Sequence, residues 1–197
     1  MEYIDFHTHH PSREGERVLQ DGVHTWGLHP WHARLPLDMP QEPGHLAAIG
    51  ECGLDVHSEA PMEVQMQVLR AQLRLAERWH LPVILHCVKC LDTLIALHRE
   101  MQPREAWVLH GFRGKPQQLR SLVTAGFHVS FGFRFNPESL ALCPIGRLLL
   151  ETDEDPRPVR LLYQEVASLR AMSVQDLVQA MQKNYQALFA RPCKPAQ

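Results

Sequence analysis

We expect residues 1–197 to form a single domain, because a chain of this length can bury a substantial core. Its hydrophobic fraction of 45% is ordinary for a globular protein, no apolar run reaches the roughly 18 residues of a membrane span, and the first residues do not resemble a secretory signal. We therefore expect a soluble, cytoplasmic protein without a membrane partner. A formal net charge of −2 argues against sequence-independent coating of nucleic acid, but it allows an enzyme that binds a few phosphates in one cleft.

Short apolar runs alternate with amphipathic segments along the chain, which is typical of β/α units around a parallel sheet. Their brevity and continuous apolar character indicate strands that are buried on both faces. In chain order, the predicted strands are residues 3–7, 25–29, 47–51, 83–86, 106–110, 128–132 and 147–152. We therefore predict an α/β fold, specifically a TIM-like β/α barrel that is shortened to seven strands.

Helices are predicted where apolar residues recur at helical spacing. Residues 63–79 carry one apolar stripe opposite charged residues, and residues 116–125 end at Gly126, a common stop signal. Ser173 and Asp176 resemble an N-terminal capping box in front of a third helix. The proline-rich segment 33–44 is expected to be a loop.

The cysteines are scattered and odd in number, which favours reduced thiols over a disulfide framework. They are Cys52, Cys87, Cys90, Cys143 and Cys193. The Cys87-x-x-Cys90 pair lacks a second close pair of cysteines, so we interpret it as incidental packing in preference to a redox or zinc motif.

Potential metal ligands stand at the ends of the predicted strands. His7 and His9 have the spacing of two that places both imidazoles on one side of an extended chain. A barrel builds its active site at the C-terminal ends of its strands, and unpaired polar groups there would be costly to bury. One histidine at a strand end is most often a hydrogen-bonded structural residue, but this reading does not fit a set of four histidines and two carboxylates. The predicted metal ligands are His7, His9, Glu51, His86, His110 and Asp153.

Six segments resemble, in order, the motifs of TatD-family metal-dependent hydrolases. They are Asp-Phe-His-Thr-His at 5–9, Gly-Leu-His-Pro at 27–30, Ile-Gly-Glu-Cys-Gly-Leu-Asp at 49–55, Pro-Val-Ile-Leu-His at 82–86, Leu-His-Gly-Phe at 109–112 and Glu-Thr-Asp at 151–153. Asn184, followed by Leu188 and Phe189, looks like the C-terminal helix of that family. The resemblance implies two divalent ions (zinc, manganese or magnesium), Glu51 as their bridge, and phosphodiester hydrolysis of DNA or RNA.

The chain departs from the family pattern in ways that reduce the rim of the site. The segment between His9 and His29 is too short for the usual extra strand and helix, so we expect a gap or distortion of the barrel there, unless residues 11–23 patch it. Val88, next to Lys89, stands where the family has an arginine, and the loop after Asp153 is short.

The expected chemistry is attack by a metal-activated water, as in a deoxyribonuclease of the exonuclease type. Glu51 and Asp153 are the predicted catalytic residues, with Asp153 orienting or deprotonating the water. We expect Asp5 to support a ligand histidine, and Asp55 and His57 to be loop residues that can also support a ligand. The predicted contacts to substrate phosphates are His29, Lys89, Arg113 and Arg134.

Two alternatives remain open from the sequence. The first is an amide or ester hydrolase of the wider metallo-dependent hydrolase group, many of which bridge their metals with a modified lysine; here that position carries Glu51. The second is a non-catalytic, metal-stabilised subunit that binds a protein partner. The oligomeric state is left open.

Overall fold

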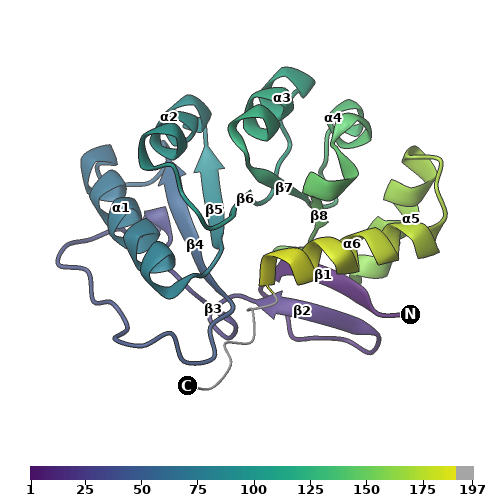
Figure 1. Ribbon diagram of the computed structural model, residues 1–197, viewed down its shortest axis with the longest axis horizontal. Helices are drawn as coiled ribbons and strands as arrows, with labels where there is room; N and C mark the ends of the chain where they lie inside the picture. Colours follow the sequence, from purple (N-terminus) through teal and green to yellow (C-terminus); the bar gives the residue numbers. More distant parts are fainter. Residues whose placement is uncertain (190–197) are drawn as a thin grey trace.

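Parallel strands with helices on their outer side make up the computed structural model, which describes residues 1–189 (Figure 1). The strands are β1 Tyr3–Thr8, β2 Glu16–Gln20, β3 Thr25–Trp26, β4 Ala48–Asp55, β5 Val83–Val88, β6 Trp107–Leu109, β7 His128–Phe131 and β8 Leu148–Leu150. The α-helices are α1 Met62–Trp79, α2 Leu91–Met101, α3 Pro116–Ala125, α4 Pro137–Leu142, α5 Val159–Leu169 and α6 Val174–Phe189. Short 3-10 turns η1 and η2 span Pro30–His32 and Ile145–Arg147. Cys193 lies outside the described residues.

The strands form a six-stranded parallel sheet in the order β3-β4-β5-β6-β7-β8 and a two-stranded parallel sheet of β1 and β2. The two sheets meet where Thr8 forms a parallel bridge with Asp153: the backbone N–H of His9 donates to Asp153 at 3.0 Å, and that of Asp153 donates to His7 at 2.9 Å. Among residues 1–189 there is no ladder between β2 and β3. The TIM-like α/β fold is confirmed, and the expected gap lies between β2 and β3.

The predicted number of seven strands was wrong, because β2 is an eighth strand. It pairs in parallel with β1, with Tyr3 opposite Glu16 and Asp5 opposite Val18. The prediction required a crossover of helix length between parallel strands. Residues 9–15 connect β1 to β2 without a helix, and an extended chain gains about 3.3 Å per residue, so this loop can run back along a five-residue strand.

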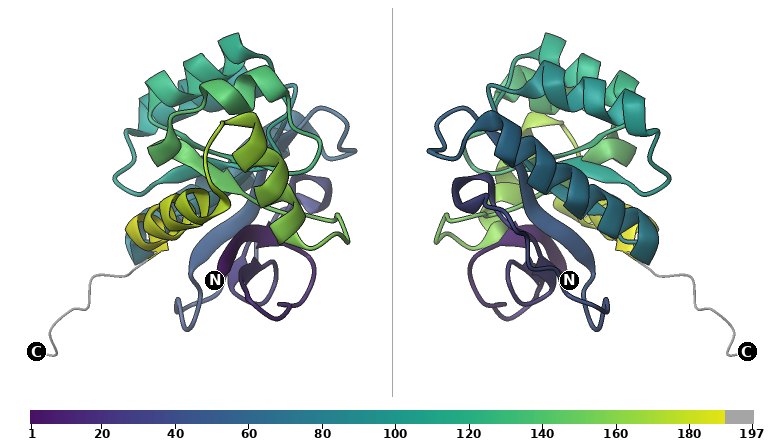
Figure 2. Two further views of the ribbon diagram at one scale, coloured as in Figure 1. Left: turned by 90° about the vertical axis from the view of Figure 1, so that its right-hand side faces the viewer. Right: turned by 90° about the vertical axis from the view of Figure 1, so that its left-hand side faces the viewer.

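The three predicted helices correspond to α1, α3 and α6, and Ser173 caps α6 by accepting a hydrogen bond from the backbone N–H of Asp176 at 3.0 Å. Helices α2, α4 and α5 were not predicted from the sequence. The segment 33–44 is irregular as expected. The helices pack on the outer face of the sheet, with α6 beside β1 and β8 (Figures 1 and 2). Among the helices in this part of the chain, none combines the length and apolarity needed to cross a membrane.

A small apolar layer fills the inside of the curved sheet. It takes one side chain from each of six strands: Phe6, Leu19, Ala48, Ile84, Val108 and Leu149. Phe189 of α6 packs against Phe6 with the ring centroids 5.5 Å apart, so the C-terminal helix contributes to this layer. The remaining core lies between the sheet and the outer helices.

Candidate metal centre

The interior layer determines which residues point into the site. Side chains alternate along a strand, so the residue two positions further on points the same way. From Ile84 and Val108 this rule leads to His86 and His110. From Leu19 and Leu149 it leads to Asp21 and Glu151.

His7 and Glu51 do not follow that alternation. The register of β1 against β2 shifts between Asp5 and Thr8, and that of β4 against β5 shifts between Ile49 and Cys52. Such irregularities change the direction in which a side chain points and are common beside active sites. A Cβ atom at Gly53 would overlap with the carbonyl oxygen of His86, so this glycine lets β4 and β5 approach closely beside the site.

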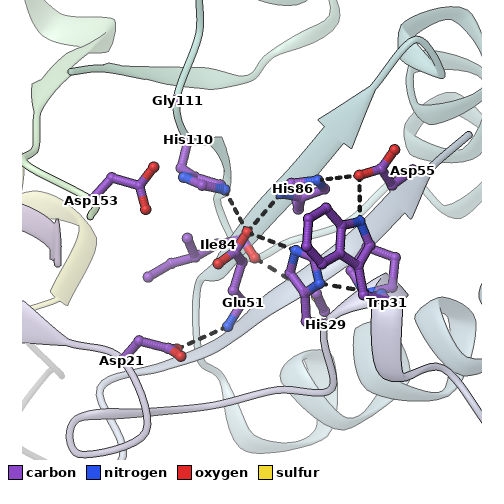
Figure 3. A network of polar contacts seen from close by, with 12 residues as sticks. Asp21, His29, Trp31, Glu51, Asp55, Ile84, His86, His110, Gly111 and Asp153 are labelled. Atoms are coloured by element: carbon purple, nitrogen blue, oxygen red, sulfur yellow. Dashed lines mark hydrogen bonds and ion pairs between the residues drawn. The ribbon is translucent and has the colours of Figure 1, made fainter. Parts of the chain in front are cut away.

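The Glu51 carboxylate lies at the centre of the histidines (Figure 3). Its Oε1 atom is 2.7 Å from Nδ1 of His86, 2.7 Å from Nε2 of His110 and 3.3 Å from Nε2 of His29. Its Oε2 atom is 3.4 Å from Nε2 of His7. Glu51 is 7% exposed. Burial opposes its ionisation, yet His110, His29 and His7 outweigh this effect and hold the pKa of Glu51 below its ordinary value.

Asp153 forms the second anionic point of the site, facing His7 and His9. Its Oδ1 atom lies 3.5 Å from Nε2 of His9 and 3.9 Å from Nε2 of His7. Burial works against ionisation of Asp153, but the hydrogen bond with His9 and the charges of His110 and His7 hold its pKa below the ordinary value. The same hydrogen bond raises the pKa of His9.

Two outer carboxylates hold the histidines that face Glu51. Nε2 of His86 lies 3.1 Å from Oδ2 of Asp55, and Nδ1 of His110 lies 3.4 Å from Oε1 of Glu151. Asp55 and Glu151 are 2% and 0% exposed. Although burial lowers it, the pKa of His110 is raised by Glu51 and Glu151 well above its ordinary value. A carboxylate behind a histidine orients the ring and makes the opposite nitrogen a better metal ligand. Asp55 is the last residue of β4, so its assignment to a loop was wrong.

His29 differs from the other histidines because a backbone amide occupies its second ring nitrogen. The N–H of Trp31 donates to Nδ1 of His29 at 3.2 Å. A neutral imidazole that accepts at Nδ1 carries its proton on Nε2. The nitrogen that faces Glu51 is therefore a hydrogen-bond donor, which suits contact with an anionic group better than metal ligation.

Three groups of side chains have ligand atoms that all lie within 4.8 Å of one another: His7, His9 and Asp153; His7, Glu51 and His110; and His29, Glu51 and His86. Both ring nitrogens of His7 are buried without a hydrogen-bond partner, which is costly unless another group binds there. Imidazole with carboxylate is a donor set suited to divalent metals. The structure thus brings all six predicted ligands together, and the residues fit a metal centre.

Two cavities open beside the centre and share Gly111, Arg113 and Asp153. The larger has a volume of about 1000 Å³ and is also lined by Lys89, while the smaller has about 200 Å³ and is also lined by Arg134. Lys89, Arg113 and Arg134 are exposed. Three of the four predicted phosphate contacts therefore lie at the walls of these cavities, and His29 lies deeper, beside Glu51.

Asp21 and Glu151 are site residues that the sequence analysis did not identify. Asp21 follows β2, and its Oδ1 atom accepts hydrogen bonds from the backbone N–H of Glu51 at 3.2 Å and from the Thr25 hydroxyl at 2.8 Å. Asp21 stands two positions after Leu19, and Glu151 stands two positions after Leu149. This spacing from an interior apolar residue is the sequence signal that identifies both. For Asp21 that signal depends on recognising β2.

Asp5, expected to support a ligand histidine, instead joins β1 to the end of β8. Its carboxylate accepts hydrogen bonds from the backbone N–H of Thr152 at 2.8 Å and from the Thr152 hydroxyl at 2.6 Å. Asp5 is 2% exposed. Its task is therefore to fix the segment that carries Asp153.

Replacing Asp5 with alanine is expected to lower the free energy of unfolding by about 1–3 kcal/mol, because the buried N–H of Thr152 loses its acceptor. Chemical denaturation of the metal-free protein measures this change. Asp38→Ala, at an exposed carboxylate, is the control. Equal stability of the Asp5 and Asp38 variants would contradict the assignment.

Comparison with known proteins shows to which family the chain belongs. A family model described as TatD-related DNase matches residues 5–190. The chain belongs to the TatD-related DNase family. This TatD-type chain is 32% identical to an uncharacterised metal-dependent hydrolase, YjjV, of Escherichia coli K12, with 84% of this chain and 76% of YjjV covered. It is 33% identical to a 3′-5′ ssDNA/RNA exonuclease TatD of Erwinia amylovora, with 84% and 77% covered.

A crystal structure of YjjV, a TatD homologue from E. coli K12, superimposes on the chain with a TM-score of 0.71 at 26% identity, covering 91% of this chain and 79% of YjjV. The predicted membership of the TatD family of metal-dependent hydrolases is therefore confirmed.

Proposed function

We propose that this TatD-type protein is a divalent-metal-dependent phosphodiesterase that removes nucleotides from the end of single-stranded nucleic acid. The observation that carries the proposal is the convergence of His7, His9, Glu51, His86, His110 and Asp153 beside a cavity with cationic walls. A relative supports the proposed activity, because it is named a 3′-5′ ssDNA/RNA exonuclease.

We propose that the centre binds two divalent ions, which are zinc, manganese or magnesium. His7, His9 and Asp153 would hold one ion, His86 and His110 the other, and Glu51 would contact both. Glu51 is shared between two of the three ligand groups, which supports its role as the bridge. When bound, divalent ions lower the pKa of water and withdraw negative charge from a phosphoryl group.

The residues of the chain then divide the remaining work. Asp153, ionised and facing His9, accepts a proton from the attacking water or orients it. His29 donates a hydrogen bond from Nε2 toward the anionic centre of the site. Lys89 and Arg113 balance the negative charge of the substrate from the cavity wall, where arginine can bind a phosphate with two N–H groups. Free thiols support the proposal that the protein is cytoplasmic. They are Cys52, Cys87, Cys90 and Cys143.

The test compares metal content and hydrolysis in one preparation. After chelation and dialysis, the protein is expected to take up two divalent ions per chain, measured by elemental analysis, and to cleave a single-stranded oligonucleotide only when loaded. Affinity for the metal is expected to rise as the pH increases above about 6.5, the ordinary pKa of an imidazole, because binding needs unprotonated imidazoles and the pKa values of His9 and His110 are raised. An amide and a carboxylic ester are offered beside the oligonucleotide. Faster cleavage of either one would replace this proposal with the small-molecule alternative.

A further inference from the structure

Trp31 is an exposed aromatic side chain at the edge of the metal centre. It is 59% exposed, and it lines the larger cavity together with Asp55, His86, Lys89 and Arg113. Because the ring stands at the wall of this cavity, its open surface is accessible to a ligand bound there.

The ring of Trp31 is held in place from several directions (Figure 3). Its indole N–H donates to Oδ2 of Asp55 at 2.7 Å, and its ring stands edge-on to His29 with the centroids 5.5 Å apart. The turn that carries it, Pro30–His32, is fixed by the hydroxyl of Ser58, which donates to the carbonyl of Pro30 at 2.8 Å. A ring that is already ordered loses little entropy when a flat ligand covers it.

The chemistry of the same cavity limits which ligand this is. The metal ligands and the cations Lys89 and Arg113 select for phosphate, while the indole offers an apolar, flat surface. Cationic walls with an aromatic platform are how proteins bind single-stranded nucleic acid without reading its sequence. The cavity volume of about 1000 Å³ is at the upper end of ordinary ligand sites, so it has room for a nucleotide.

We propose that Trp31 forms a nucleobase subsite, on which the base next to the scissile phosphate stacks. This inference rests on the proposed phosphodiesterase function and specifies its substrate: a chain of nucleotides with bases, not a bare sugar phosphate. It places the base on the side of the centre formed by His29, Asp55 and His86.

Two substitutions separate stacking from a merely structural role of Trp31. Trp31→Phe keeps an aromatic face and loses the N–H that binds Asp55, whereas Trp31→Leu loses both. The substrates are a single-stranded oligodeoxynucleotide and the same oligomer with abasic sugar phosphates at both ends, each at saturating manganese. If the base stacks, Trp31→Leu raises KM for the base-bearing oligomer about tenfold, with kcat changed less than about threefold. Trp31→Phe stays within about threefold of wild type, and the three proteins cleave the abasic oligomer equally.

Nucleotide binding without hydrolysis provides the independent measurement. Adenosine 5′-monophosphate is expected to quench the tryptophan fluorescence of the wild type, ribose 5-phosphate is not, and the quenching disappears in Trp31→Phe. Quenching without hydrolysis of any oligomer retains the subsite and overturns the phosphodiesterase. Hydrolysis with equal KM for all three proteins overturns the subsite and leaves the phosphodiesterase. An equal rise of KM in Trp31→Phe and Trp31→Leu has the same consequence. If neither quenching nor hydrolysis is observed, both the subsite and the phosphodiesterase function are overturned.

Discussion

Replacing Glu51 with glutamine is expected to weaken metal binding by more than about 100-fold and to remove hydrolysis at micromolar metal. The reason is the central place of the carboxylate, within 3.4 Å of His7, His29, His86 and His110. A neutral amide cannot compensate two adjacent cations, and loss of an outer-shell partner alone already costs about 10–100-fold in affinity. Titration of the metal-free protein with zinc, followed by calorimetry, measures the change.

The control for this variant is Glu59→Gln, which makes the same chemical change at an exposed position in the loop after β4. Its metal affinity should match that of the wild type. Circular dichroism of the metal-free Glu51→Gln protein shows whether the fold persists, so that lost affinity is not mistaken for unfolding. Glu51→Gln protein that is folded and binds both ions as tightly as wild type would show that Glu51 is not a bridge.

The direction of His86 and His110 was predictable because the residue spacing of the sequence determines it. His86 and His110 stand two positions after Ile84 and Val108, and this spacing fixes their direction in any strand that is buried on both faces. His7 and Glu51 lie where the strand register shifts, which the spacing of residues does not reveal. Both were placed in the site because they stand at the ends of predicted strands, and His7 also because of its spacing of two from His9.

Strand β2 and Asp21 were missed for one physical reason, which lies in the shortened N-terminal part. Strand β2 buries only Val18 and Leu19 fully, so its apolar run is too short to be distinguished from a loop. Without β2 there was no strand end on which to place Asp21. The role of an exposed ring such as that of Trp31 depends on what surrounds it, which residue spacing does not show. Only the contacts with His29 and Asp55 show that the ring is held beside the metal centre.

Asp153→Asn is expected to keep at least one metal ion and lose turnover, which separates the role of Asp153 from that of Glu51. Asp153 has a positive φ of 58°, a conformation that asparagine adopts as readily as aspartate. The backbone links from Asp153 to His7 and His9 therefore persist in the variant. The amide oxygen still faces His9, but an amide cannot accept the proton of the attacking water. We expect kcat to fall by roughly 10²–10⁴-fold, the scale for losing a positioned base.

The decisive comparison measures kcat and bound metal in the same sample of Asp153→Asn. Asp38→Asn, an amide substitution at an exposed carboxylate, should leave both unchanged. At least one ion should remain, because Glu51, His86 and His110 keep their contacts with one another. Metal loss in proportion to lost activity would make Asp153 a ligand without a role in proton transfer. Full activity with metal bound would remove it from the mechanism, and the base would then have to be sought among the carboxylates that remain near the histidines, of which Asp21 beside the Glu51 backbone is the first candidate.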